Sequence, residues 1–286
     1  LICFLSRKKR KKNMLNDVAF GQYYPAQSAV HKMDPRAKIV FLIAYIVVIF
    51  LVKNFFGFLA AGAFVVLAVI FSRVPFLKVL KSIKAILVLI IITFLINLLL
   101  HEDADATVYY SFWVFKITDK SIEFALFMAL RLIYLVLGSS VLTLTTTPVA
   151  LTDGIESLLK PLKVVKFPVH ELALIMSIAL RFIPTLMEET NRIISAQKAR
   201  GADFDSGSIF KKVKALLPVL IPLIVSAFRR ADELGEAMDA RCYSGSKNRT
   251  KYKKLKFTYR DLIALLVMGA LYAGVILLNI YGVNVI

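Results

Sequence analysis

Long apolar runs that are almost free of charged side chains dominate this sequence of 286 residues. Five of them cover residues 39–52, 55–71, 85–100, 122–146 and 262–281. Runs of this kind are typical of helices that cross a lipid bilayer, whose hydrocarbon core needs about 20 apolar residues. Because 58% of the residues are hydrophobic and only 20% are charged, we expect an all-α, multi-pass membrane protein with five or more transmembrane helices.

The formal net charge of +18 comes largely from basic residues that lie beside and between the apolar runs. Such clusters are typical of cytoplasmic loops, so we expect a bilayer and no nucleic acid as the partner of these charges. The segment 72–84 carries four basic residues and no acidic one, whereas the segment 101–121 carries four acidic and two basic residues. The positive-inside rule then predicts a cytoplasmic N-terminus for a multi-pass protein of the cell membrane.

This orientation predicts how the chain is organised. Residues 1–13 are expected to be a basic tail that precedes a candidate start at Met14. The parts that follow from the orientation are a cytoplasmic tail and lead-in at 1–38, transmembrane helices 1 to 4 at 39–146, a cytoplasmic region of amphipathic helices at 147–260, and the last transmembrane helix at 261–286.

Two apolar runs inside the cytoplasmic region differ from ordinary spans. The run 172–186 is interrupted by an arginine and a proline, and the run 215–228 contains two prolines between basic flanks. Runs of this length are more often interfacial or buried helices than spans. If both crossed the bilayer they would do so as a pair, so the orientation of the last span is the same in either case.

Each of these two runs leads into an amphipathic helix that ends in Ala-Arg. The ends are Ala199-Arg200-Gly201 and Ala240-Arg241-Cys242, and the two arginines are 41 residues apart. In the first copy the residues that recur on one face are Leu186, Thr190, Ile193, Ile194 and Gln197, and those on the other are Glu188, Glu189, Asn191, Arg192 and Lys198.

The repetition of this ending carries the functional hypothesis. A single Ala-Arg-Gly is the ordinary signature of a helix C-terminus, where a cation complements the helix dipole. Two copies in equivalent settings favour a second interpretation, in which two protruding arginines engage two similar soluble partners through bidentate hydrogen bonds.

Motifs for catalysis and for cofactor binding are missing from the sequence. The chain has no glycine-rich phosphate loop, so ATP is expected to be bound by partner subunits and no cofactor by this chain. His170-Glu171 lacks the second histidine of a zinc helix, and the two cysteines are far apart, so no metal site is predicted. Glu188-Glu189 resembles the paired glutamates of intramembrane prenyl-protein proteases, but the following arginine is one residue too close.

Arg131 is the one charged residue well inside a predicted span. Such residues usually face a partner helix or a cavity, because exposure to lipid is costly. We expect either a structural arginine, paired for example with Glu123, or an intramembrane functional contact. No Asp or Glu lies at the centre of a span, which disfavours a transporter powered by its own proton or sodium relay.

The lead-in segment, residues 21–38, contains the pattern Ser28-x-x-His31-x-x-Asp34-Pro35-Arg36 just before the first apolar run. This segment resembles the corresponding part of the transmembrane T component of energy-coupling factor (ECF) transporters. With the two Ala-Arg motifs, the resemblance extends over nearly the whole chain.

The resemblance implies a non-catalytic scaffold subunit of an ATP-driven importer for vitamins or other micronutrients. Its partners would be two ATPase subunits and a membrane S component that binds the substrate. Arg200 and Arg241 would be the main ATPase contacts, with Ala199, Gly201 and Ala240 allowing close approach. Cys242 stands where such motifs commonly have glycine. The apolar faces of 172–186 and 215–228 would hold the S component.

Two alternatives from other classes stay open on the sequence alone. One is an intramembrane protease and the other is a permease that binds its substrate unaided. By this resemblance the chain does not itself hold the substrate. Its sequence therefore identifies neither the micronutrient nor the number of S components that share the scaffold.

Overall fold

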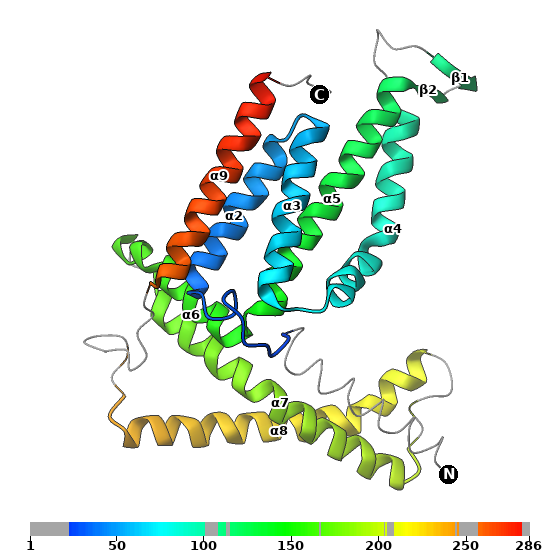
Figure 1. Cartoon of the computed structure of the whole chain (residues 1–286). Helices are drawn as coiled ribbons and strands as arrows, with labels where there is room; N and C mark the ends of the chain where they lie inside the picture. Colours follow the sequence, from blue (N-terminus) through cyan, green and yellow to red (C-terminus); the bar gives the residue numbers. More distant parts are fainter. Residues whose placement is uncertain are drawn as a thin grey trace, which may run out of the picture. The chain divides into compact units, whose positions relative to one another are not determined.

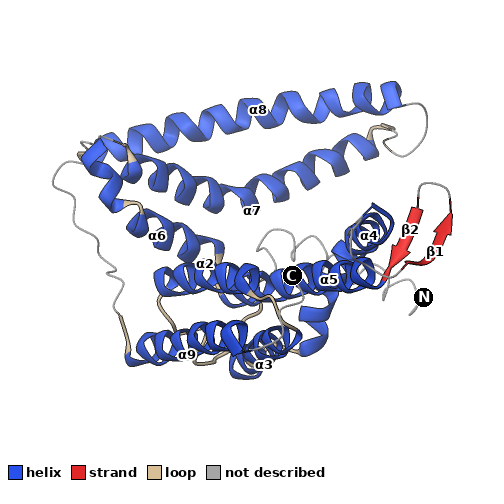
Figure 2. Ribbon diagram, turned by 90° about the horizontal axis from the view of Figure 1, so that it is seen from above, coloured by secondary structure: helices blue, strands red, loops and turns tan. Residues whose placement is uncertain are grey.

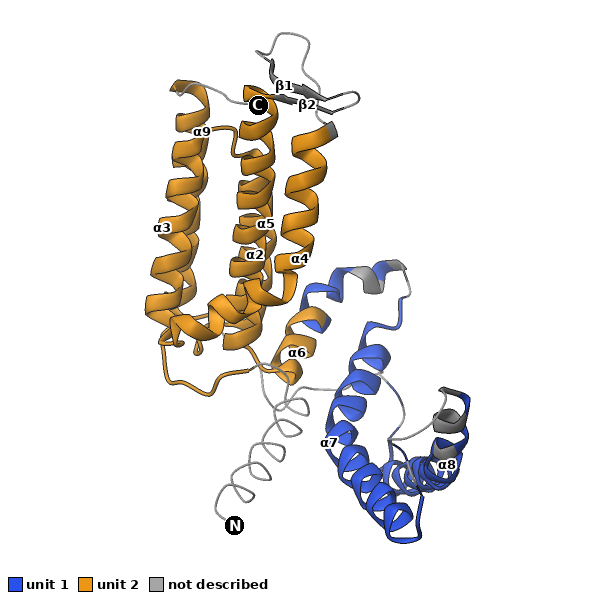
Figure 3. Cartoon of the chain, turned by 90° about the vertical axis from the view of Figure 1, so that its right-hand side faces the viewer, with its two compact units in different colours: residues 1–21, 156–253 blue, residues 22–155, 254–286 orange. Residues whose placement is uncertain are grey.

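A computed structural model describes residues 23–100, 108–112, 115–165, 167–202, 204, 209–243, 245 and 257–281. The described residues form two compact units, shown in Figures 1 and 3. The bundle unit lies within residues 22–155 and 254–286, and the helix-pair unit lies within residues 156–253.

The bundle unit consists of long helices that run side by side (Figure 1). α2 and α3 both contact α5 and α9, and α4 packs mainly on α5. The helices are α2 (Pro35–Leu51), α3 (Phe55–Ser72), α4 (Phe76–Leu100), α5 (Asp119–Thr145) and α9 (Tyr259–Tyr281). The expected all-α fold is thereby confirmed, and each of the five predicted apolar runs corresponds to one helix, to within one residue at its end.

Close approach of α2 to α5 depends on a glycine. Tyr45 of α2 is 2% exposed, and its hydroxyl donates to the carbonyl of Tyr134 at 3.1 Å. A Cβ at Gly138 of α5 would lie 2.3 Å from Cε1 of the Tyr45 ring, so only glycine leaves room for it. Small residues of this kind let helices pack closely in membranes, where packing rather than water exclusion drives association.

Five described helices are long and apolar enough to cross a bilayer, namely α3, α4, α5, α9 and α7 of the helix-pair unit. α2, which contains the predicted run 39–52, has 17 residues and is shorter than these five. The basic segment 72–84, expected to be a loop, lies mostly in the first turns of α4 instead. Lysine has a high helix propensity, so the three lysines there do not end a helix.

A short antiparallel hairpin stands between α4 and α5. Its strands are β1 (Val108–Phe112) and β2 (Phe115–Thr118). Thr118 and Ser121 then form a reciprocal capping box that starts α5. Three of the four acidic residues of the segment 101–121, at positions 102, 103 and 105, lie outside the described residues.

The helix-pair unit contains two long helices that contact each other, α7 (Val169–Ala199) and α8 (Ile209–Ala240). Figure 2 shows them from a second direction. α6 (Pro148–Leu158) and the 3₁₀ turn η1 (Lys160–Val165) precede them. Pro184, Pro218 and Pro222 all lie inside continuous helices. A proline removes one backbone hydrogen bond, which the many remaining turns of helices of 31 and 32 residues can outweigh.

Candidate functional site

The two Ala-Arg endings have the same backbone geometry. At the end of α7, Gly201 N–H donates to the Lys198 carbonyl at 3.1 Å, and Ala202 N–H donates to the Gln197 carbonyl at 3.0 Å. At the end of α8, Cys242 N–H donates to Asp239 at 2.8 Å, and Tyr243 N–H donates to Met238 at 3.0 Å. Both pairs of bonds define a Schellman motif, which places Arg200 and Arg241 at equivalent C-cap positions.

Cys242 adopts the left-handed conformation that its glycine counterpart adopts. The backbone φ is +54° at Cys242 and +86° at Gly201. A side chain in this region is strained by about 1–2 kcal/mol, because its Cβ approaches the following carbonyl oxygen. The departure from glycine therefore changes the stability of the second ending but leaves its shape intact.

All six residues of the two endings are exposed. Within the described part of the chain, the side chains of Arg200 and Arg241 have no hydrogen bond or ion pair. Because guanidinium groups offer five donors in a planar fork, each ending presents an unused site for a carboxylate or a backbone carbonyl.

The predicted packing face of α7 is confirmed. Leu186, Thr190, Ile193, Ile194 and Gln197 are all partly buried, and four of the five residues predicted on the opposite face are exposed. The 41-residue shift transfers this face to α8 only in part. Leu234 and Met238, which correspond to Ile193 and Gln197, are partly buried, whereas Ala227, Ala231 and Gly235 are exposed.

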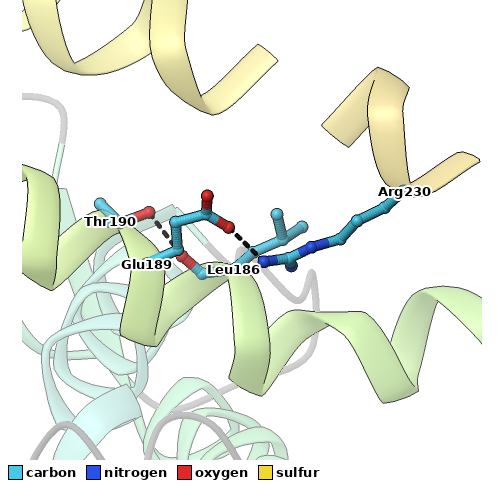
Figure 4. A network of polar contacts seen from close by, with 4 residues as sticks. All are labelled: Leu186, Glu189, Thr190 and Arg230. Carbon is cyan, nitrogen blue, oxygen red and sulfur yellow. Dashed lines mark hydrogen bonds and ion pairs between the residues drawn. The ribbon is translucent and has the colours of Figure 1, made fainter. Parts of the chain in front are cut away.

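Glu189 is the one residue of the predicted opposite face that is not exposed, because its side chain bridges the two helices. Its Oε2 accepts a hydrogen bond from Nη2 of Arg230, and the two side chains are 24% and 26% exposed (Figure 4). Glu189 and Arg230 are themselves separated by 41 residues, so equivalent positions of the two repeats meet at this contact. The amphipathic pattern could not reveal the pairing, which depends on how the two helices cross.

Large apolar side chains remain exposed along both helices. They cluster in the proline-containing halves, away from the arginine endings, and include Leu172, Ile175, Met176, Ile183, Leu217, Leu220, Ile221, Ile224, Val225 and Phe228. Contiguous apolar surface of this kind marks contact with lipid or with a protein partner.

The lead-in segment belongs to the bundle unit and is folded around His31. The carbonyl of Tyr24 can only accept, so His31 Nε2 donates to it at 2.9 Å, and Nδ1 then accepts from the Ser28 hydroxyl at 2.7 Å. Tyr24 N–H donates to the Leu144 carbonyl at the end of α5 at 2.9 Å. Burial and the nearby Lys38 lower the pKa of His31 below its ordinary value of 6.5, against the opposing effect of the Tyr24 hydrogen bond.

Asp34 and Pro35 begin α2 and join it to α9. The Asp34 side chain caps α2 by accepting from Arg36 N–H at 2.9 Å, and Pro35 is the first helical residue. Asp34 N–H in turn donates to Asp261 Oδ1 at 3.0 Å, and Asp261 Oδ2 accepts from Thr258 N–H at 2.8 Å.

Lys38 completes this junction by binding the end of α5. Its Nζ donates to the Thr145 carbonyl at 3.0 Å and to the Thr146 hydroxyl at 3.1 Å. The sequence motif around His31 thus holds together the ends of three helices. Lys38 and Asp261 were not predicted, because nothing in the sequence links residues more than 100 positions apart.

Arg131 binds backbone rather than an acidic side chain. Its Nη2 donates to the Val52 carbonyl at 3.2 Å, and its guanidinium lies 5.5 Å from the centroid of the Phe50 ring. The Val52 carbonyl is at the C-terminal end of α2, where the helix dipole favours a cation. The pairing with Glu123 offered for the structural interpretation is therefore replaced by a helix-end contact.

His170 at the start of α7 is paired with Glu156 of the preceding helix, with Nδ1 3.2 Å from Oε1. Among the described residues no group of three or more His, Cys, Asp or Glu side chains is placed to hold a metal ion.

Similarity to known proteins extends over the lead-in segment and both Ala-Arg endings. A family model described as "Cobalt transport protein" (CbiQ) matches residues 26–252, from the lead-in segment to beyond the second Ala-Arg ending. The chain belongs to the CbiQ family. Several relatives of this CbiQ-family chain carry the name "Energy-coupling factor transporter transmembrane protein EcfT".

The similarity to these relatives extends over most of both chains. The relative from Ruminiclostridium cellulolyticum is 49% identical over 250 residues, which cover 87% of this chain and 92% of that protein. The one from Clostridium kluyveri is 48% identical over 252 residues, with 88% and 93% covered. The Bacillus subtilis protein is 45% identical over 261 residues, with 90% and 98% covered. The resemblance to the ECF transmembrane component is thereby confirmed.

Proposed function

We propose that this chain is the energy-coupling scaffold of an ATP-driven ECF importer and that its two arginine endings dock on two ATPase subunits. The observation that supports the proposal is the pair of identical Schellman endings with exposed guanidinium groups. Two equivalent ATPases need two equivalent contacts, and a repeated helix ending supplies them in a single chain.

The helix pair has the geometry of two crossed levers. Glu189 and Arg230 each lie ten residues before the last alanine of their helix. The contact between them is therefore about 15 Å along each helix from its arginine ending. Movement of the ATPases during ATP binding and hydrolysis would displace the arginine endings, and the crossing would carry the displacement to the proline-containing halves.

The apolar face of those halves is proposed to hold the membrane S component, which binds the substrate. The exposed Leu, Ile, Val and Phe side chains of α7 and α8 match an apolar helical partner in their chemistry. The family description names cobalt and the sequence resemblance suggested a vitamin. In this proposal the S component, rather than this chain, sets the substrate.

The chain itself is proposed to be non-catalytic, to bind no cofactor and to have its N-terminus in the cytoplasm. ATP would be bound only by the partner subunits. An intramembrane protease would instead show peptide cleavage by the purified chain that is lost in Glu188→Ala, and a permease would retain substrate without any other subunit.

The decisive experiment combines Arg200→Ala with Arg241→Ala in cells that carry the complete transporter. We expect the ATPase subunits to be lost from the purified complex and ATP-dependent uptake to fall at least about tenfold, while the membrane protein stays folded. The matched control is Arg192→Ala with Arg229→Ala, which removes two exposed cations from the same helices without touching their endings. Unchanged assembly and uptake in the first double variant would reject the proposal.

A further inference from the structure

Two adjoining cavities of the bundle unit differ sharply in chemistry. The first, of about 470 Å³, is lined almost entirely by apolar side chains of α2, α3, α5 and α9. The second, of about 450 Å³, lies beside it and is lined by polar and basic residues of the lead-in segment, the end of α3 and the start of α9. The cavities share Ala29, Phe71, Tyr259 and Arg260 as lining residues, so they lie directly beside each other.

Three cations converge on the polar cavity. Lys32 comes from the lead-in segment, Arg73 from the C-cap of α3 and Arg260 from the first turn of α9. No carboxylate is among the described residues that line either cavity. The nearby Asp34 and Asp261 are buried and accept backbone N–H groups, so they do not pair with these three cations.

The backbone at Arg73 is held in a conformation that disfavours a side chain. Its φ is +54°, in the left-handed region where glycine is preferred. The basic residue at this strained position lies in the wall of the polar cavity. Two aromatic residues that line both cavities, Phe71 and Tyr259, are 63% and 65% exposed, as is common where helices pass the lipid headgroups.

We propose that this double cavity binds one anionic phospholipid, with the phosphodiester between Lys32, Arg73 and Arg260 and an acyl chain against the apolar surface of α2, α3 and α9. Basic pockets between transmembrane helices are suited to anionic headgroups, and a zwitterionic lipid has no net charge to match three cations. The ligand would link the lead-in segment to the end of α3 and the start of α9, which line the polar cavity together. The proposal depends on the chain lying in a bilayer and is independent of the ATPase contacts.

The test uses the full-length chain in nanodiscs of phosphatidylcholine, with and without phosphatidylglycerol. We expect native mass spectrometry to show one retained phosphatidylglycerol and thermal unfolding to shift upward when that lipid is present. Replacing all three cations, by Lys32→Gln, Arg73→Gln and Arg260→Gln, should weaken the preference for phosphatidylglycerol at least about tenfold.

The matched control replaces Lys53, Lys81 and Lys84 with glutamine, which removes the same charge from exposed positions outside both cavities. Ala68→Phe, which fills the apolar cavity, should also weaken retention and tests the acyl-chain part even if the triple variant does not fold. Equal retention of both lipids by the unmodified chain would overturn the proposal. So would an equal loss in the control, or full displacement of phosphatidylglycerol by inorganic phosphate.

Discussion

At the scale of single residues, the helix endings show how one geometry is built from two different side chains. Gly201 and Cys242 occupy the same left-handed position, with the same two backbone hydrogen bonds around it. Only the strain differs between the two endings, so the positions allow a reciprocal test.

We expect Cys242→Gly to stabilise the end of α8 by about 0.5–1 kcal/mol, since relief of strain is partly offset by the greater freedom of glycine in the unfolded chain. Gly201→Cys should destabilise the end of α7 by about the same amount. Hydrogen exchange at the Tyr243 and Ala202 amides would measure both effects. Slower exchange in Gly201→Cys would contradict the assignment.

His31 makes the lead-in segment sensitive to acid. Because burial lowers the pKa of His31 in the folded chain, the unfolded segment binds a proton more readily. The contribution to stability is therefore complete above pH 6.5 and is lost as the pH falls from there through the folded pKa. Protection of the Tyr24 amide against hydrogen exchange, corrected for intrinsic rates, should drop in that range. In His31→Gln the protection should no longer vary with pH, and a persistent drop would assign the effect to another group.

At the scale of elements, hydrophobic runs and face patterns predicted most of the helices and the packing stripe of α7. The prediction is confirmed at positions whose burial follows from the amphipathic pattern of a single helix, as at Ile193 and Gln197. It failed where a second element decides, as at Glu189, whose partner lies on α8. Pro184 interrupts the apolar run 172–186 in the sequence but lies inside the continuous helix α7, because a proline removes only one of its many backbone hydrogen bonds.

The close contact between Gly138 of α5 and Tyr45 of α2 allows a test of helix packing. Gly138→Ala should lower the stability of the bundle by about 1–3 kcal/mol, because the new methyl group would overlap the buried Tyr45 ring. The control is Gly274→Ala in α9, where a Cβ meets nothing within 4 Å and alanine improves helix propensity. Thermal unfolding in detergent would compare the two, and equal midpoints would show that Tyr45 adapts without cost.

At the scale of the whole molecule, the chain combines a bundle with a separate helix pair, and the proposed mechanism needs both. The repeat at Arg200 and Arg241 was found in the sequence, and the structure gives both arginines the same C-cap geometry. The sequence could not anticipate the junction of Asp34, Lys38 and Asp261, because such contacts arise only when helices remote in the sequence are brought together.

In the proposed mechanism the crossing of α7 and α8 transmits movement, while the arginine endings dock on the ATPases. Glu189→Arg should reduce uptake several-fold while the ATPases still co-purify, because the arginine endings are intact but their helices are no longer tied together. The pair is partly exposed, so its loss should change stability by no more than about 1 kcal/mol. Adding Arg230→Glu should restore much of the uptake. If the reversed pair transports no better than the single variant, the ion pair is not the coupling element.

The bond between Asp34 and Asp261 also constrains how the protein is made. The first helix of the bundle is translated early, but the carboxylate that receives the Asp34 amide is 227 positions further along the chain. Between them the ribosome must produce the whole helix pair. The bundle can therefore close only after α9 has entered the bilayer, and a nascent chain that stops short of that helix leaves its first helix without its last neighbour.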